Sequence, residues 1–140
     1  MHFIHIYTDG SCLKPNGPSG WAFIGIDNTK IWQFSDGDAN STNNRMELTA
    51  VIEALDFFDE YHYDQYYVYT DSKYVINGIT EWINNWKLIG WKKVKNVDLW
   101  KRLDESIKNK NIKWQWVKAH NGDKYNEIVD LIAKEEAKKK

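Results

Sequence analysis

Ile-His-Ile-Tyr-Thr-Asp-Gly-Ser, residues 4–11, is the stretch around which the rest of the chain is organised. Its apolar and β-branched residues alternate as in a strand, and the pattern stops at Asp9 before a turn at Gly10. The same local pattern recurs in Val-Tyr-Thr-Asp-Ser, residues 68–72. If the two strands are parallel neighbours, Asp9 and Asp71 lie about one strand spacing apart, ~4.8 Å.

Two carboxylates this close need a physical explanation. Ligands of open α/β sheets bind beyond the carboxyl ends of the strands. Two ionised carboxylates repel there, so one takes up a proton or both share a cation. We interpret Asp9 and Asp71 as ligands of a shared divalent metal. Taken singly, either residue fits the commoner role of a helix cap or turn former, and that alternative stays open.

Composition limits the class of protein. The chain has 140 residues, 42% hydrophobic and 28% charged, which is typical of one globular domain with a sizeable core. A net charge of −1 gives no global attraction to nucleic acid, so a polyanion must bind a local patch. The single cysteine, Cys12, excludes an internal disulfide and suits a reducing compartment.

The ends of the chain carry no recognisable targeting pattern. The first residues lead directly into the predicted strand without a signal-peptide pattern, and no apolar run approaches the ~20 residues that span a bilayer. We therefore expect a soluble, cytoplasmic, single-domain monomer over residues 1–140, without an obligate protein partner or a membrane. Residues 136–140 are expected to form a frayed tail.

The predicted elements give a mixed sheet covered by helices. Loops are expected at residues 10–20 and 35–43, where Gly, Pro and polar residues concentrate. Strands are expected at residues 4–9, 21–26, 30–34, 64–70 and 112–117. Helices are expected at 44–61, 72–79, 98–108 and from 124 onward.

The helix at residues 44–61 has the clearest apolar periodicity, at positions 48, 51, 52, 55 and 58. Glu47 falls on the flank of that face in the first turn, where it can lean toward the sheet or simply favour the helix dipole. Asp130 lies inside the last predicted helix, although Asp is a poor helix former. Its face carries Asn126 and small residues, so a functional and an exposed position are both open.

The carboxylates favour a hard cation. A set of three or four carboxylates without a Cys/His ligand set suits Mg²⁺ or Mn²⁺. Two such ions, about 3.5–4 Å apart, can support phosphodiester cleavage. His120, in a Gly-containing loop, is a candidate for proton transfer, although an ordinary surface histidine is the alternative.

Residues 82–95 interleave tryptophans with lysines, among them Trp82, Trp86, Lys92 and Lys93. This composition is typical of a nucleic-acid-facing surface, where lysines meet phosphate and rings meet sugars or bases. The alternative is an amphipathic helix with core tryptophans and solvated lysines.

Ordered motifs along almost the whole chain resemble the type 1 ribonuclease H family. They are Thr-Asp-Gly-Ser-Cys at 8–12, Thr-Asn-Asn-Arg-Met-Glu-Leu at 42–48, Thr-Asp-Ser at 70–72, Gly-Ile-Thr-Glu-Trp-Ile at 78–83, Lys-Asn-Val-Asp-Leu-Trp at 95–100 and Val-Lys-Ala-His-Asn-Gly at 117–122, followed by Asn126, Glu127 and Asp130.

The resemblance implies a ribonuclease H-like fold, a five-stranded mixed sheet flanked by helices on both faces. It also implies an endonuclease that cuts the RNA strand of RNA–DNA hybrids and leaves 5′-phosphate and 3′-hydroxyl ends. The family carboxylates, which hold two Mg²⁺ with Mn²⁺ as a possible substitute, correspond to Asp9, Glu47, Asp71 and Asp130, and the loop histidine corresponds to His120.

Substrate contacts are also implied by the resemblance. Thr42 and Asn96 match positions that grip a DNA phosphate, and Trp82 matches an aromatic residue of the DNA-strand channel. Ser11, Cys12 and Asn43 match positions near the RNA 2′-hydroxyls, which distinguish RNA from DNA. The remaining predicted contacts are Asn16, Lys73, Trp86, Lys92 and Lys93.

Several positions depart from the family pattern. Residues 15–17 read Pro-Asn-Gly instead of Asn-Pro-Gly, which puts the Asn16 contact in doubt. Asn40 replaces an arginine of the phosphate pocket, Lys73 replaces Gln or Asn, and Ala119 replaces Gly. The basic protrusion, residues 86–95, is short and carries Leu-Ile at 88–89, so weaker hybrid affinity is expected.

Three rival interpretations remain. The chain could be a hybrid-binding module that has lost cleavage, although five intact catalytic positions argue against this. It could be another nuclease of the same superfamily, although the motif at 42–48 and the Trp82 region argue against that. A domain of a reverse transcriptase is the third.

Overall fold

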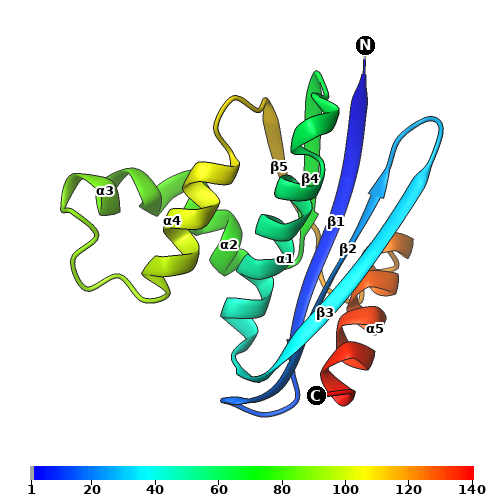
Figure 1. Ribbon diagram of the computed structural model, residues 1–140, viewed down its shortest axis with the longest axis horizontal. Helices are drawn as coiled ribbons and strands as arrows, with labels where there is room; N and C mark the ends of the chain where they lie inside the picture. The colour runs from blue at the N-terminus through cyan, green and yellow to red at the C-terminus, as the bar shows by residue number, and fades with distance from the viewer. Residues whose placement is uncertain (1) are drawn as a thin grey trace.

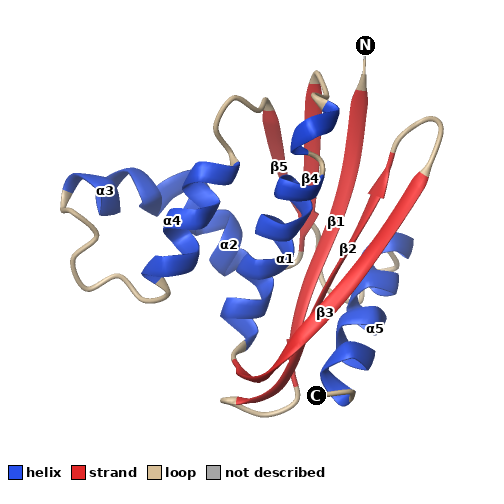
Figure 2. Ribbon diagram, viewed as in Figure 1, coloured by secondary structure: helices blue, strands red, loops and turns tan. Residues whose placement is uncertain are grey.

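The computed structural model describes residues 2–140, and its sheet begins with three long antiparallel strands. These are β1 (Phe3–Cys12), β2 (Gly17–Ile26) and β3 (Ile31–Ser41). β4 (Gln65–Thr70) joins β1 in parallel, and β5 (Ile112–Trp116) joins β4 in parallel. The strand order β3-β2-β1-β4-β5 is the expected five-stranded mixed sheet (Figure 2).

Helices cover both faces of this sheet (Figure 1). α1 (Asn43–Phe57) packs on one face, and α5 (Lys124–Lys138) packs on the other. Between β4 and β5 the chain forms α2 (Lys73–Asn77), a π-helical segment (Gly78–Trp82), α3 (Ile83–Leu88) and α4 (Val97–Ser106). No helix within residues 2–140 is long and apolar enough to cross a membrane.

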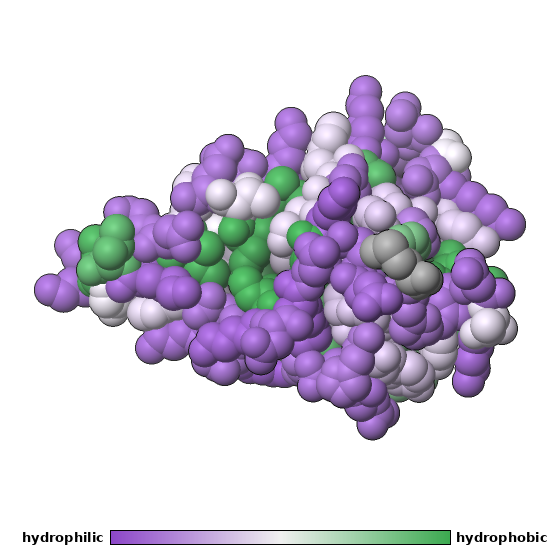
Figure 3. Space-filling view, turned by 90° about the horizontal axis from the view of Figure 1, so that it is seen from above, coloured by the Kyte–Doolittle hydropathy of each residue, from purple (hydrophilic) through white to green (hydrophobic). Residues whose placement is uncertain are grey.

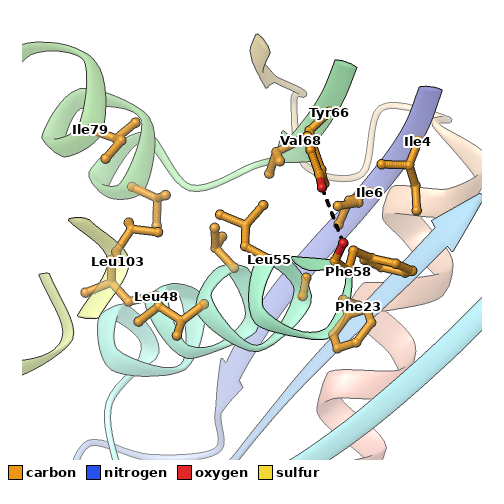
Figure 4. Close-up of a cluster of buried hydrophobic side chains, with 14 of the residues drawn as sticks. Ile4, Ile6, Phe23, Leu48, Leu55, Phe58, Tyr66, Val68, Ile79 and Leu103 are labelled. Atoms are coloured by element: carbon orange, nitrogen blue, oxygen red, sulfur yellow. Dashed lines mark hydrogen bonds between the residues drawn. The ribbon is translucent and has the colours of Figure 1, made fainter. Parts of the chain in front are cut away.

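The larger core lies between α1 and the sheet. The five apolar positions predicted for α1 are all inaccessible to solvent: Leu48, Val51, Ile52, Leu55 and Phe58. They pack against alternate β1 residues, Ile4 and Ile6, and against Val68 of β4 (Figure 4). The opposite face of β1 and β2 packs on α5 through a smaller cluster. The two clusters fix the sheet between α1 and α5.

Both predicted loops are wrong in their extent. β1 continues through Cys12 and β2 begins at Gly17, so only residues 13–16 connect the two strands. Gly10 lies against α1 and Gly20 against α5, where a Cβ atom would collide with helix backbone. These glycines allow a strand to pack closely on a helix. The close approach explains why glycine occurs inside these two strands.

The segment predicted as a loop at residues 35–43 is also mostly strand, because β3 pairs with β2 through Ser41. The helix then starts at Asn43, with the Thr42 hydroxyl accepting a hydrogen bond from the Arg45 backbone N–H. Glu47 is therefore in the second turn of α1. The helix itself ends at Phe57, and a 3₁₀ turn (Asp59–Tyr61) completes the predicted segment.

The predicted frayed tail is likewise corrected. α5 continues to Lys138, with Ala137 fully buried against the sheet. The Ser35 hydroxyl donates to the Glu136 carboxylate at 2.9 Å, and the Lys140 Nζ atom lies 2.9 Å from the Asp36 carboxylate. These contacts tie the end of α5 to β3.

Candidate active site

The parallel pairing of β1 and β4 brings the two Thr-Asp motifs together. Tyr7 pairs with Tyr69, so Asp9 and Asp71 each lie two residues farther along at the same edge of the sheet. Asp9 is 2% exposed, whereas Asp71 is half-buried. The parallel arrangement predicted from residues 4–11 and 68–72 is therefore confirmed.

Glu47 approaches the same point from α1. The close packing of Gly10 on the α1 backbone sets the distance between the helix and β1. As a result, carboxylate oxygens of Asp9, Glu47 and Asp71 lie within 4.8 Å of one another. These three residues form what we call the carboxylate cluster.

The carboxylate cluster contains buried oxygens without a donor. The Gly10 N–H donates to Asp9 Oδ1 at 2.9 Å, but Asp9 Oδ2 and Glu47 Oε1 have no hydrogen-bond partner. A buried acceptor without a donor is costly, and a buried charge more so. Within residues 2–140, no lysine or arginine forms an ion pair with the cluster. The described lysines and arginines therefore do not compensate the charge of the cluster.

Burial and mutual repulsion make these carboxyls hard to ionise. Burial, followed by the charge of Asp71, raises the pKa of Asp9 to about 8. Burial and the charge of Asp9 raise the pKa of Glu47 well above its usual range. Burial and the charge of Asp130 raise the pKa of Asp71, although Asn126 and the charge of His120 oppose the rise. A bound cation would reverse this penalty.

Asp130 lies beside the carboxylate cluster rather than within it. Its charge raises the pKa of both Asp9 and Asp71, so its carboxylate faces the cluster from α5. One oxygen, Oδ2, forms an ion pair with the Lys134 Nζ atom at 3.0 Å, one helical turn later. The fourth predicted carboxylate is therefore near the other three but is held by a lysine.

Asn126 is a polar residue that the sequence-based site did not include. It is 1% exposed, and its side-chain Oδ1 atom has no hydrogen-bond partner. It precedes Asp130 by four residues, so the two side chains share one face of α5. That spacing, together with its place in the motif that ends at Asp130, is the signal in the sequence that could have identified it.

His120 lies in the exposed loop between β5 and α5, with a left-handed backbone (φ 56°). Its charge opposes the rise in the pKa of Asp71, so the ring acts electrostatically on the cluster. The loop thus brings a titratable ring to the cluster without packing it into the core.

Several predicted substrate contacts gather beside the cluster. Cys12, Thr42 and Asn43 line a pocket of about 280 Å³ together with Pro15 and Asn44. The Cys12 thiol lies 3.3 Å from the Ser41 carbonyl, which joins the end of β1 to the end of β3. Ser11 adjoins Cys12 on β1, whereas Asn16 is exposed in the connecting turn with φ 58°.

Arg45 connects this pocket to Asn96. Its guanidinium donates to the Asn96 side-chain oxygen at 3.3 Å and forms a two-bond ion pair with Asp98. The Asn96 amide donates to the Tyr74 hydroxyl at 3.1 Å. Arg45 was not among the predicted site residues, although it lies within the motif at 42–48. Arg45 and Tyr74 together fix the orientation of the Asn96 side chain.

Residues 82–95, the Trp/Lys segment, divide into a half-buried part that packs against the core and an exposed part. Trp86 packs on the buried Trp100 ring, with centroids 5.1 Å apart, so the core interpretation applies to Trp86. Trp82 is 39% exposed, and Lys92 and Lys93 are exposed. A green apolar patch marks the outer end of α3, where Leu88 is 85% exposed (Figure 3).

Comparison with known proteins decides the family. A family model described as RNase H matches residues 2–138. The chain belongs to the ribonuclease H family. Ribonuclease H of Pseudoalteromonas atlantica is 48% identical, with 98% of this chain and 92% of that protein covered. Ribonuclease H of Neorickettsia sennetsu is 49% identical, with 94% and 91% covered.

Solved structures of ribonucleases H share the fold. LC9-RNase H1, a type 1 RNase H with the type 2 active-site motif, superposes with a TM-score of 0.88 at 26% identity, covering 99% of this chain and 74% of its own. LC11-RNase H1, solved in complex with an RNA/DNA hybrid, gives a TM-score of 0.69 at 20% identity, covering 94% and 97%. The resemblance to the type 1 ribonuclease H family is thereby confirmed.

Proposed function

We propose that this chain is an endonuclease that hydrolyses the RNA strand of RNA–DNA hybrids with the help of two divalent ions, normally Mg²⁺. Membership of the ribonuclease H family supports the reaction. The single observation that carries the proposal is the set of buried carboxylate oxygens without a donor at the end of β1. A site built only for folding would pair or solvate such oxygens.

The residues present fit hard divalent ions. Mg²⁺ and Mn²⁺ prefer carboxylate oxygens, and the cluster offers them without a competing thiol or imidazole ligand. Asp9, Glu47 and Asp71 would hold the ions together with Asp130. When bound, two such ions activate an attacking water and stabilise the charge that develops on the phosphate.

The side chains around the cluster have distinct proposed roles. Asp9, buried on β1, and Glu47, half-buried on α1, would offer carboxylate oxygens that are held in place by the packing of α1 on β1 and become ionised when a cation binds. His120, exposed in the loop before α5, is proposed to move a proton to or from solvent. The phosphodiester bond breaks at the 3′ oxygen, which takes a proton, and the water oxygen becomes part of the 5′-phosphate.

Strand discrimination is assigned to the pocket beside the cluster. Ser11, Cys12 and Asn43 are proposed to contact the RNA 2′-hydroxyls, which a DNA strand lacks. Thr42 and Asn96 are proposed to bind a DNA phosphate, with Arg45 holding Asn96 in place. Trp82, Lys92 and Lys93 are proposed to extend this surface along the DNA strand, whereas Trp86 supports it from the core.

The decisive experiment is cleavage of a labelled RNA–DNA hybrid beside an RNA duplex, a DNA duplex and single-stranded RNA, with Mg²⁺ and with chelator. We expect metal-dependent cutting of only the RNA strand of the hybrid. Hybrid binding without cutting would favour the hybrid-binding module, and cutting of DNA would favour another nuclease of the superfamily.

A second experiment tests the assignment of His120. His120→Ala is expected to slow turnover by about a hundredfold, the lower limit of general acid–base effects, because the carboxylates remain in place. A loss as severe as that of Asp9→Asn would contradict the auxiliary role. A single-domain, monomeric, cytoplasmic protein also remains our proposal, testable by sedimentation and cell fractionation.

A further inference from the structure

Trp116, the last residue of β5, contacts the backbone of Asp71. Its indole Nε1–H donates to the Asp71 carbonyl oxygen at 3.1 Å. Trp116 pairs with Thr70 across the sheet, and the next residue along, Val117, donates its N–H to the Thr70 carbonyl at 2.9 Å. The backbone carbonyls of Thr70 and Asp71 therefore both accept hydrogen bonds from residues at the end of β5.

The ring face of the same indole contacts the ammonium group of a lysine. The Lys73 Nζ atom lies 4.9 Å from the centroid of the Trp116 ring. Such cation–π contacts hold an ammonium group by the negative face of the ring while leaving its donors free. Lys73 therefore has a defined position although its side chain is exposed.

The Lys73 ammonium is not neutralised by the acidic residues near it. Lys73 follows Asp71 by two residues, yet within residues 2–140 it takes part in no ion pair. Lys134, on the other side of the cluster, does pair with Asp130. The cation–π contact with Trp116 positions the Lys73 ammonium and leaves its charge available for an anion.

We propose that Trp116 is a positioning residue of the active site. Its N–H fixes the backbone of Asp71, and its ring places the Lys73 ammonium to bind a backbone phosphate of the nucleic-acid substrate. This inference rests on the proposed function, which brings a polyanion to the cluster. It adds a phosphate contact on the β5 side of the site, away from Thr42 and Asn96.

The two contacts of Trp116 can be separated by substitution. Lys73→Met removes the charge and keeps the chain length, Trp116→Phe keeps a ring face and removes the N–H donor, and Trp116→Leu removes both contacts. Lys30→Met is the matched control, because the Lys30 Nζ atom rests 5.3 Å from the Trp32 ring at the β2–β3 turn (Figure 1). That turn lies at the opposite end of the sheet from Asp9.

The first readout is the salt dependence of hybrid binding. One phosphate contact contributes about 0.9 to the slope of log K for hybrid binding against log [salt]. When salt is lowered from 1 M to 0.1 M, the affinity of Lys73→Met should therefore rise about eightfold less than that of the wild type. Lys30→Met should keep the wild-type slope. In steady-state kinetics, Lys73→Met should raise KM and leave kcat nearly unchanged.

The second readout separates positioning from packing. Trp116→Phe is expected to keep the wild-type slope and KM but to lower kcat about fivefold, the equivalent of one hydrogen bond. The effect of Lys73→Met on affinity should shrink in the Trp116→Leu background, because the ring no longer places the ammonium. Thermal melting of every variant controls for unfolding. If Trp116→Leu fails to fold, the single variants Trp116→Phe and Lys73→Met still test the two contacts of Trp116.

The outcomes distinguish two kinds of failure. A wild-type protein that neither binds nor cuts the hybrid would overturn the proposed function and this inference with it. A wild-type protein that cuts the hybrid, beside a Lys73→Met variant with an unchanged slope, would overturn the phosphate contact alone. Strict additivity of Lys73→Met and Trp116→Leu would overturn the positioning role of the ring.

Discussion

Aspartates in two parts of this molecule have opposite electrostatic surroundings. Within β1, Asp9 is buried, forms no ion pair with any described lysine or arginine, and has a pKa raised to about 8. At the start of α4, Asp98 is exposed and receives two hydrogen bonds from Arg45, at 3.0 and 2.7 Å, which lower its pKa to about 2. The environment, rather than the residue type, decides which aspartate ionises easily.

The difference separates the carboxylates proposed to bind metal from a carboxylate whose charge is compensated within the chain. Asp98 has its charge compensated within the chain, so ionisation favours the folded state. Asp9, Glu47 and Asp71 repel one another in a partly dry site, so ionisation disfavours the folded state until a cation arrives. Functional sites commonly lower the stability of the folded state, and favourable interactions elsewhere in the protein offset that loss.

The largest expected effect comes from removing a charge of the carboxylate cluster. Asp9→Asn keeps the shape of the side chain but removes a metal ligand, so hybrid cleavage should fall on the order of a thousandfold. Initial rates in saturating Mg²⁺ would measure this loss, with circular dichroism as the control for folding. Near-normal turnover in Asp9→Asn would remove the metal role assigned to the cluster.

The same substitution should stabilise the metal-free protein. A pKa of Asp9 raised to about 8 from 3.8 means that its stabilising contribution is complete below pH 4 and is lost as pH rises toward 8. In chelator at pH 8, Asp9→Asn should therefore gain on the order of 1 kcal/mol in the free energy of unfolding.

Urea unfolding of both proteins at pH 5 and pH 8 tests this expectation. The advantage of Asp9→Asn should be smaller at pH 5, where the wild-type cluster holds more protons. Added Mg²⁺ should stabilise the wild type much more than the variant, because it binds the folded state. A variant that is less stable than the wild type at pH 8 in chelator would contradict the repulsion argument.

A smaller effect is expected at the edge of the carboxylate cluster. Lys134 forms an ion pair with one oxygen of Asp130, and this pair would compete with the metal proposed to bind there. Lys134→Met removes this competitor and a nearby positive charge, so the dissociation constant for Mg²⁺ should fall about twofold to threefold, the equivalent of a partly exposed pair.

Isothermal calorimetry with Mg²⁺ alone measures that change without relying on turnover. Lys138→Met is the matched control, since Lys138 pairs with Glu135 in the last turn of the same helix. Equal Mg²⁺ affinity in the wild type and Lys134→Met would mean that the pair opens without cost.

The sequence predicted the elements whose patterns depend on local periodicity. The spacing of Leu48, Val51 and Leu55 marks the buried face of α1, and all three are inaccessible. The repeated Thr-Asp pattern predicted the meeting of Asp9 and Asp71, because parallel strands end at one edge of the sheet. These features are encoded by neighbours in sequence, so they could be read without coordinates.

Features that depend on tertiary pairing were missed. Residues 35–41 are polar and Gly-containing, which favours a loop, but pairing with β2 makes them a strand. Asn126 and Arg45 both lie in motifs that carry the family resemblance, but their roles depend on burial and on partners distant in sequence, which the motifs alone do not reveal. The division of the Trp/Lys segment into core Trp86 and exposed Trp82 has the same origin.

The smallest effect is expected at the ion pair on the outside of the protein. Asp98 is 61% exposed in its side chain, so solvent screens its attraction to Arg45, and Asp98→Asn should cost no more than about 1 kcal/mol at pH 7. Because the folded-state pKa lies below 3.8, this contribution is present above pH 4 and disappears as pH falls through about 2. Denaturant unfolding between pH 7 and pH 2 should show the two proteins converging in acid, with Glu60→Gln as an exposed-carboxylate control. The sign is opposite to that at Asp9, where acid favours the folded wild type, so a gap that persists at pH 2 would break the contrast between the two aspartates.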